Sequence, residues 1–159
     1  MFIAIWSEDA NNGIGLNGAI PWKIQDENTY LKKFVNGKKV LIGKNAFLLL
    51  KSKLEFSSDI FVVTQNDNLK EIDERIRIIH NLEEFINRYK DSEEIVYVLG
   101  GKQIIESIIN DCKHAIYLKH KQKYPCDTFL KIDYKKFIIT DIENFENSQI
   151  FHCDISHKI

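Results

Sequence analysis

The chain has 159 residues, of which 44% are hydrophobic and 28% are charged, and its formal net charge is -1. This length suits a single domain with a sizeable core, and the balanced charge gives no global field that would recruit nucleic acid or a membrane surface. The cysteines Cys112, Cys126 and Cys153 are odd in number and lack metal-ligand spacing. We therefore expect neither a disulfide framework nor a metal site, and we expect reduced thiols in the cytoplasm.

Short apolar runs rich in β-branched residues recur along the chain. Continuous runs of this kind are typical of strands that are buried on both faces of a sheet. None approaches the roughly 18 apolar residues of a membrane span, and the first run lacks the basic start of a signal peptide. The runs are Phe2–Trp6, Val40–Ile42, Ile60–Val63, Ile76–Ile79, Ile95–Leu99, Ala115–Leu118 and Phe137–Ile139.

Amphipathic stretches separate these runs and predict helices. Apolar residues recur at helical spacing over residues 30–35, 82–89 and 104–109, and Asn81 with Glu84 has the spacing of a capping box. Alternating strands and helices predict a mostly parallel sheet covered by helices on both faces, a three-layer αβα architecture. The last 45 residues contain strand-like runs without a helix, so we expect an antiparallel finish at the sheet edge. No linker or repeat divides residues 1–159, so we expect one domain.

Two strand–glycine–helix junctions are candidates for phosphate binding. They span residues 40–45 and 98–103, and each places a lysine, Lys44 or Lys102, directly after its glycine or glycine pair. Glycine lets a ligand approach the backbone closely, and a helix N-terminus offers free N–H groups. Either junction could also be a simple turn. The presence of two such junctions in one small domain favours binding of the diphosphate of a dinucleotide.

The segment 12–22 follows the first strand and carries Gly13, Gly15 and Gly18. It is also apolar, with Ile14 and Ile20 among its residues, whereas a merely connecting loop is more polar. An apolar loop with glycine hinges at the end of a strand is typical of a lid over a ligand. The alternative is a loop that packs on the core.

The next helix carries the candidate acid. Glu27 shares a helix face with apolar residues, which is costly for a carboxylate unless it serves a polar partner. It could bind the amidine-like edge of a pterin or pyrimidine ring and help deliver a proton. The alternative is that Asp26 and Glu27 only favour the helix dipole, a role that suits Asp26 better.

Taken in order, these features resemble the dihydrofolate reductase family over nearly the whole chain. The family has a glycine-isoleucine-glycine segment, a proline-tryptophan pair and an acid on the next helix. It also has a strand ending in glycine and a basic residue, a glycine pair after a later strand, and an aspartate-threonine pair. The matching residues here are Gly13–Gly15, Pro21–Trp22, Glu27, Gly43–Asn45, Gly100–Gly101 and Asp127–Thr128.

The resemblance implies an eight-stranded, mostly parallel sheet with an antiparallel C-terminal edge strand and about four helices. It also implies that NADPH lies across the carboxyl edge of the sheet and passes a hydride to C6 of a dihydropterin. Glu27 would bind the pterin 2-amino and N3 positions and favour protonation at N5. Ile20 and the loop ending at Trp22 would close over the nicotinamide.

The resemblance further implies two sets of binding residues. The substrate set consists of Ile5, Glu27, Leu31, Leu50, Leu54, Ser57, Leu99 and Lys119. The cofactor set consists of Ala4, Ile14, Gly15, Gly18, Gly43, Lys44, Asn45, Ala46, Thr64, Gln65, Gly100, Gly101, Lys102, Gln103, Ile104 and Ile105. Within the cofactor set, Lys44, Thr64 and Gln65 match the positions that hold the adenosine 2′-phosphate.

Four positions depart from the family pattern. Ser57 stands where the family has an arginine for the glutamate tail, and the nearest bases are Lys51 and Lys53. Ile105 replaces a tyrosine near the nicotinamide, and Ala46 replaces a threonine near the diphosphate. The fourth departure is Lys119, which replaces a threonine beside the acid. It would either pair with Glu27 and lower the pKa of that carboxyl, or point to solvent if the alignment slips by one residue.

Three functions stay open at this stage. The first is NADPH-dependent reduction of 7,8-dihydrofolate to tetrahydrofolate. The second is reduction of a smaller pterin, flavin or pyrimidine without a glutamate tail by an enzyme of the same fold. The third is a non-catalytic relative that binds the cofactor. In each case we expect a cytoplasmic monomer whose partners are small molecules.

Overall fold

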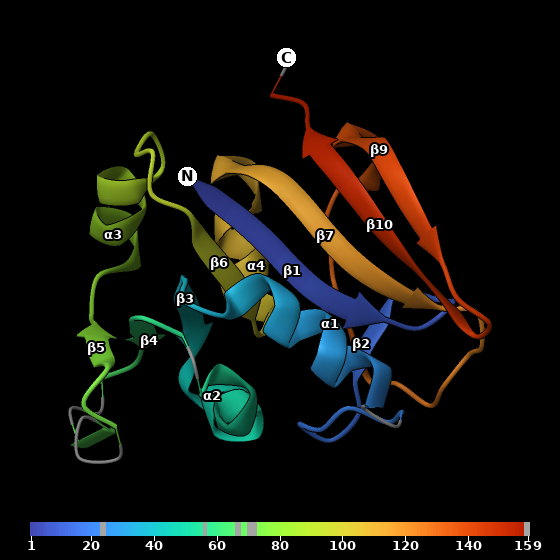
Figure 1. Cartoon of the computed structure of the whole chain (residues 1–159), viewed down its shortest axis with the longest axis horizontal. Coiled ribbons are helices and arrows are strands. Elements are labelled where there is room, and N and C mark those ends of the chain that lie inside the picture. Colours follow the sequence, from blue (N-terminus) through green and yellow to red (C-terminus); the bar gives the residue numbers. More distant parts are fainter. Residues whose placement is uncertain (23–24, 56, 66–67, 70–72, 158–159) are drawn as a thin grey trace.

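The computed structural model describes residues 1–22, 25–55, 57–65, 68–69 and 73–157, and for residues 25–29 it describes the backbone alone. The described residues form four α-helices, which lie around one large sheet (Figure 1). The helices are α1 (Gln25–Val35), α2 (Lys44–Leu50), α3 (Leu82–Tyr89) and α4 (Lys102–Ile108). Short 3₁₀ turns follow α2 at Lys51–Leu54 and α4 at Ile109–Asp111, and a third lies at Tyr134–Lys136.

The large sheet has eight strands in the order β5-β4-β3-β6-β1-β7-β10-β9. Its strands are β1 (Phe2–Glu8), β3 (Lys39–Gly43), β4 (Ile60–Val63), β5 (Ile76–Ile79), β6 (Val96–Gly100), β7 (Cys112–His120), β9 (Phe137–Asn144) and β10 (Ser148–Ile155). Pairing is parallel from β5 across to β7 and antiparallel from β7 to β10 and from β10 to β9. A small second sheet pairs β2 (Gly13–Gly15) with β8 (Thr128–Phe129).

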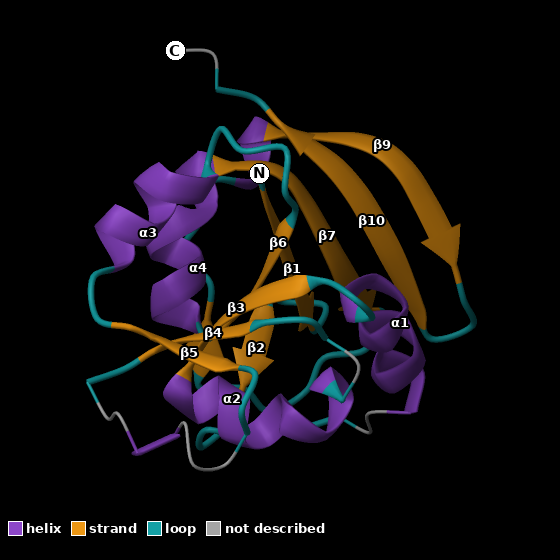
Figure 2. Ribbon diagram, turned by 60° about the vertical axis from the view of Figure 1, so that its left-hand side comes forward, coloured by secondary structure: helices purple, strands orange, loops and turns teal. Residues whose placement is uncertain are grey.

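Two hydrophobic clusters fill the spaces on either side of the sheet. Residues of α3 and α4 pack on the face that carries Ala4 and Trp6, whereas α1 and α2 pack on the face that carries Ile3 and Ile5. Figure 2 shows α3 and α4 on one side and α1 and α2 on the other. The predicted three-layer αβα architecture is therefore confirmed.

The predicted antiparallel pairing of the C-terminal strands at the sheet edge is also confirmed, although the order of these strands needed refinement. The C-terminal strand β10 lies one position in from the edge, between β7 and β9, and β9 forms the edge. The sequence pattern marked no run over Ser148–Ile155, because polar residues such as His152 and Asp154 interrupt it. Continuous apolar runs identify strands that are buried on both faces, so a strand of mixed composition is missed.

The glycine junctions form where they were predicted. Gly43 and Gly101 are the N-caps of α2 and α4, and neither helix has a side-chain cap. Gly100 has φ of 113°, which favours glycine, and the peptide bond between Gly100 and Gly101 is cis. Asn81 caps α3 by accepting a hydrogen bond from the backbone N–H of Glu84. Within the described residues, no helix is long and apolar enough to cross a membrane.

Asp9 holds the turn that leads from β1 to β2. Its carboxylate accepts hydrogen bonds from the backbone N–H groups of Asn11 (2.9 Å), Gly13 (2.8 Å) and Tyr124 (2.9 Å). Burial opposes the ionisation of Asp9, but these three donors outweigh it and lower the pKa of this carboxyl below its usual value. Asp9 therefore joins the start of the glycine-rich loop to the segment after β7.

Replacing Asp9 with alanine should destabilise the fold by about 1–3 kcal/mol at neutral pH, because buried donors lose a charged acceptor. Because the pKa of Asp9 is lower in the folded state, its ionised carboxylate stabilises the fold fully at pH values above the unfolded pKa of about 4. This stabilisation is lost as the pH falls through the folded pKa. Urea unfolding at pH 7 and at pH 3 should therefore show a smaller difference between wild type and variant at pH 3.

The matched control for this measurement is Asp91→Ala, which removes an exposed carboxylate. It should change stability little at either pH. A pH-independent loss of stability in Asp9→Ala would contradict the assignment of the effect to the ionised carboxylate.

Candidate active site

A cavity of about 380 Å³ opens at the carboxyl end of β1. Its walls come from the end of β1, the loop after β2, α1, α2 with the turn that follows it, and the start of α4. Parallel strands bring their carboxyl ends to one edge of a sheet, and ligands of open α/β sheets bind in the crevice at that edge. The position of the cavity is therefore that of a ligand site.

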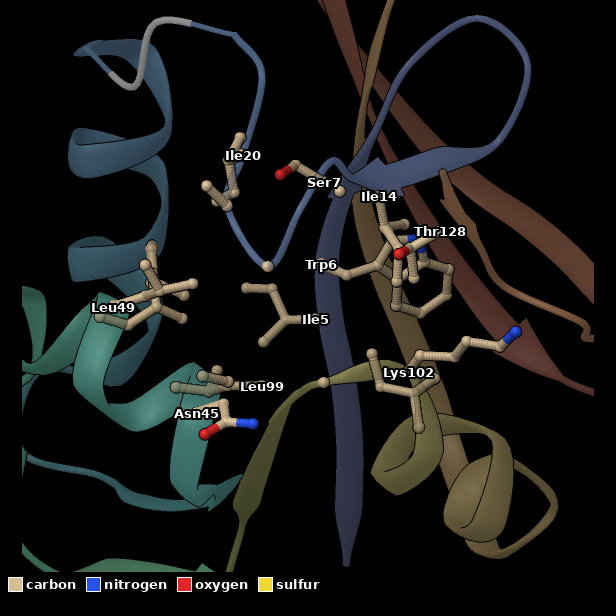
Figure 3. Close-up of a pocket in the computed structure, with 18 of the residues that line it drawn as sticks. Ile5, Trp6, Ser7, Ile14, Ile20, Asn45, Leu49, Leu99, Lys102 and Thr128 are labelled. Carbon is tan, nitrogen blue, oxygen red and sulfur yellow. The ribbon is translucent and has the colours of Figure 1, made fainter. Parts of the chain in front are cut away.

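Figure 3 shows two groups of side chains separated by Ile5. Ile20, Leu49, Leu99 and Asn45 lie on one side of Ile5. Trp6, Ile14, Thr128 and Lys102 lie on the other. Both faces of β1 contribute because the cavity wraps around the end of the strand, where Ile5 and Trp6 point to opposite sides of the sheet.

Many residues that the sequence suggested line this cavity. They are Ile5, Ile14, Gly15, Gly18, Ile20, Leu31, Asn45, Ala46, Leu50, Leu99, Gly101, Lys102 and Ile105. Residues outside the two predicted binding sets also line it. They are Trp6, Ser7, Ala19, Tyr30, Leu49, Lys53 and Thr128. Two sequence signals could have indicated some of these residues. Leu49 and Lys53 are four residues apart, which is helical spacing, and Tyr30 adjoins the predicted residue Leu31.

Other predicted residues lie behind the cavity wall. Ala4 and Leu54 are fully buried in the two core clusters. Trp22, at the end of the loop that the resemblance places over the nicotinamide, packs against the ring of His120 at 4.7 Å and that of Tyr124 at 5.5 Å between ring centroids. Trp22 therefore anchors the end of the glycine-rich loop to the segment after β7.

The predicted phosphate-binding residues gather at the same edge of the sheet, outside the cavity lining. Gly43 at the end of β3 pairs with Val63 at the end of β4, so Lys44 and Thr64 follow neighbouring strand ends. The Gln65 side chain donates to the His80 carbonyl at 3.5 Å. The members of the cofactor set found here or around the start of α4 are Gly43, Lys44, Thr64, Gln65, Gly100, Gln103 and Ile104.

Glu27 belongs to α1, but its side chain lies outside the part of the chain that the structure describes. The helix itself is well placed, because Tyr30 and Leu31 of α1 both line the cavity. The Tyr30 hydroxyl donates to the Ile116 carbonyl at 3.1 Å and so fixes α1 to β7. The role of Glu27 stays a prediction.

Ser57, which the sequence placed in the substrate set, does not lie in the cavity wall. Ser57 is buried, and its hydroxyl donates to the Val35 carbonyl at 3.1 Å, so it does not line the cavity. Arg75 holds the same segment, because its guanidinium donates to the carbonyls of Leu54, Glu55 and Ser57 at 2.7–3.0 Å. Lys53, one of the two bases near Ser57 in sequence, lines the cavity instead.

The pairing of Lys119 also needs correction. Lys119 lies opposite Glu8 in the β1–β7 register, and its ammonium donates to Glu8 at 2.8 Å and to Asn12 at 2.7 Å. Strand faces alternate, so Lys119 shares the Trp6 face, whereas Leu118 packs in the cluster that contains Tyr30 of α1. Lys119 therefore pairs with Glu8, and its side chain is only 30% exposed.

Glu8 is the centre of a buried polar network beside the cavity. Its fully buried carboxylate accepts from Trp6 Nε1 at 2.9 Å and from the Tyr134 hydroxyl at 2.7 Å, in addition to Lys119. Burial and the neighbouring carboxylate raise the pKa of Tyr134 above its usual value, so this phenol stays a donor. The network holds the Trp6 indole in the cavity wall.

Within the described residues, no group of three or more His, Cys, Asp or Glu side chains is arranged to hold a metal ion. The site geometry therefore rests on an apolar cavity, two glycine-capped helices and a few polar groups at its margins.

Comparisons with known proteins agree with this geometry. The family model described as dihydrofolate reductase matches residues 1–158. The chain belongs to the dihydrofolate reductase family. A dihydrofolate reductase from Mycoplasma genitalium is 30% identical over 153 residues, covering 94% of this chain and 95% of that protein. One from Mycoplasma pneumoniae is 29% identical over 162 residues and covers 100% and 99% of the two chains.

A solved structure shares the fold. Dihydrofolate reductase from Enterococcus faecalis, complexed with NADP(H) and RAB-propyl, has a TM-score of 0.81 and 19% identity. The match covers 99% of this chain and 97% of that one. The family resemblance stated from the sequence is thus confirmed.

Lys119→Met should destabilise the protein by about 1–3 kcal/mol, because it leaves the buried Glu8 carboxylate without its cation. The loss should be smaller than for a fully buried pair, because the Lys119 side chain is partly exposed. Thermal unfolding measures this effect. The double variant Glu8→Gln/Lys119→Met removes the uncompensated charge, so it should be more stable than Lys119→Met alone. A double variant as unstable as the sum of the two single variants would contradict the coupling.

Proposed function

We propose that this protein reduces 7,8-dihydrofolate to tetrahydrofolate with NADPH. The observation that carries the proposal is the cavity at the carboxyl end of β1, enclosed by the glycine-rich loop and by α1 and α2, in a chain that belongs to the dihydrofolate reductase family. Curated relatives from two Mycoplasma species carry the same family name over almost their whole length.

The residues at the edge of this cavity fit a dinucleotide. A side-chain Cβ built on Gly101 meets no heavy atom within 4 Å, so a ligand can approach this part of the backbone closely. Because α2 and α4 lack side-chain caps, their first N–H groups are available to phosphate oxygens, and Lys44 and Lys102 add positive charge. NADPH, when bound, supplies the hydride.

The cavity walls keep water away from the reacting groups. Ile5, Ile20 and Leu99 present branched apolar side chains to the cavity, and the loop that carries Ile20 forms one of its walls. Excluding water strengthens the electrostatic interactions inside a site and suppresses side reactions. In the proposal, Glu27 orients the pterin through the 2-amino and N3 positions and favours a proton at N5.

The purified chain should oxidise NADPH when dihydrofolate is added, followed as loss of nicotinamide absorbance. Glu27→Gln should lower kcat by about 100-fold or more at neutral pH, because general acid–base assistance contributes about that much. Binding of NADPH should not change.

The matched control for Glu27→Gln is Asp26→Asn, which neutralises the adjacent carboxylate in the same helix. It should keep most of the activity. Equal losses in the two variants would place the effect in the helix dipole instead of in the acid. Tight NADPH binding without turnover of any pterin would favour a non-catalytic relative.

Lys53 is the basic group that we propose for the far end of the substrate. It lines the cavity beside Leu49 and Leu50, and it is 7% exposed. Arg75 is engaged with backbone carbonyls and with Asp73, and the Ser57 hydroxyl is engaged with Val35, so neither is placed to serve the cavity. An ammonium gives a carboxylate a point charge without the bidentate fork of arginine.

Lys53→Met should raise the KM for dihydrofolate by about tenfold, because a charge-assisted contact contributes about 1.5–3 kcal/mol. The KM for a dihydropterin without a glutamate tail should stay the same. Steady-state kinetics with both substrates measures the difference. Lys51→Met, which removes an exposed lysine outside the cavity lining, is the control.

The same experiment tests the second candidate function. Ser57 and Arg75 make hydrogen bonds to backbone carbonyls and so do not offer a site for a glutamate tail. These contacts also suit a smaller pterin, flavin or pyrimidine substrate without a tail. If this candidate is right, Lys53→Met changes neither KM and the untailed substrate is reduced faster than dihydrofolate. We further propose that the protein acts as a monomer in the cytoplasm, where reduced thiols match its three free cysteines.

A further inference from the structure

A second cavity of about 290 Å³ lies between α1, the end of β7 and the hairpin formed by β9 and β10. Figure 2 shows α1 beside the turn that joins β9 to β10. The cavity is lined by Tyr30, Lys33, Phe34, Leu118, Glu143, Phe145, Ser148 and Ile150. Tyr30 also lines the first cavity, so one aromatic side chain belongs to both walls.

Ser148 in this lining has an unsatisfied hydroxyl. Its side chain is 2% exposed, and among the described residues its Oγ is the buried side-chain polar atom without a hydrogen-bond partner. Leaving a buried hydroxyl unpaired costs about 1–3 kcal/mol, so such a group in a native protein calls for a specific explanation, of which a bound partner is one. A polar atom of a bound ligand would satisfy it.

The lining carries one basic and one acidic side chain, and of these two only the basic one has no ion-pair or hydrogen-bond partner among the described residues. Glu143 is already paired, because its Oε2 lies 2.8 Å from His152 Nε2. Lys33 is exposed, and no carboxylate of the described residues pairs with it; its ammonium lies 5.8 Å from the centroid of the Phe34 ring. An acidic ligand would give Lys33 the partner that it lacks among the described side chains.

The remaining walls favour a flat, apolar body. Phe34 and Phe145 contribute aromatic rings, and Leu118 and Ile150 are buried aliphatic side chains. The volume is at the lower end of the range for small-molecule sites, about 300–1,000 Å³, so it suits a single ring better than a dinucleotide. We propose that this cavity binds a small aromatic carboxylate, with the carboxylate at Lys33 and a second polar substituent at Ser148.

The probe for this site is 4-hydroxybenzoate, titrated into the full chain by isothermal titration calorimetry. Lys33→Gln and Ser148→Ala should each weaken binding about fivefold or more, since losing a hydrogen bond or charge contact of about 1 kcal/mol changes affinity by that factor. Lys32→Gln, the neighbouring lysine of α1 outside the cavity lining, should bind the probe as wild type does.

Two further ligands separate the contacts. Benzoate lacks the hydroxyl, so Ser148→Ala should weaken 4-hydroxybenzoate but leave benzoate unchanged. Phenol lacks the carboxylate, so Lys33→Gln should leave its weaker binding unchanged. Ser148→Ala should not lower the melting temperature of the free protein, because it removes an unpaired polar group. A clear fall in melting temperature would mean that the hydroxyl is already partnered and would overturn the assignment.

The site must also be distinct from the substrate site. The titration is repeated with saturating dihydrofolate and without NADPH, so that no turnover occurs, and binding of 4-hydroxybenzoate should persist. Loss of binding under these conditions would place the probe in the first cavity and overturn the proposal. No binding to wild type at millimolar concentration, or equal binding to wild type, Lys33→Gln and Ser148→Ala, would overturn it as well.

Discussion

The alternation of side chains along β1 and β7 determines what the active-site region contains. Both strands lie inside the sheet, so consecutive residues enter different cores. Ile5 joins the core under α1, whereas Trp6 joins the core under α4. Glu8 follows Trp6 on the same face and is fully buried, and a buried carboxylate requires a cation or several donors. Lys119 meets this need because the parallel register places it opposite Glu8.

The same alternation sets the limit of sequence reasoning here. Seven strands of the large sheet and the two glycine junctions could be predicted because continuous apolar runs and glycine positions are local signals, whereas β10 could not. The partner of Lys119 could not, since a slip of one residue in the alignment exchanges the two faces of a strand. Trp6 was missed for a related reason: within an apolar run, nothing local distinguishes a core residue from one that borders a cavity.

Ser57 illustrates a second limit, which comes from contacts that are distant in sequence. Arg75 donates to three carbonyls of the segment 54–57. It also pairs with Asp73, and the hydrogen bond from its guanidinium lowers the pKa of the Asp73 carboxyl. A segment held in this way turns Ser57 toward Val35 and leaves Lys53 on the cavity side. The resemblance drew attention to Ser57, whereas the basic side chain that lines the cavity from this segment is that of Lys53.

Helix α1 connects these local arrangements. Leu31 faces the first cavity and Phe34 faces the second, while Tyr30 borders both and is tied to β7 by its hydroxyl. Residues four apart share a helix face, so Tyr30 and Phe34 follow one another along α1, and their rings pack together at 5.6 Å between centroids. A ligand in the second cavity would therefore contact Tyr30, a side chain that also borders the first cavity.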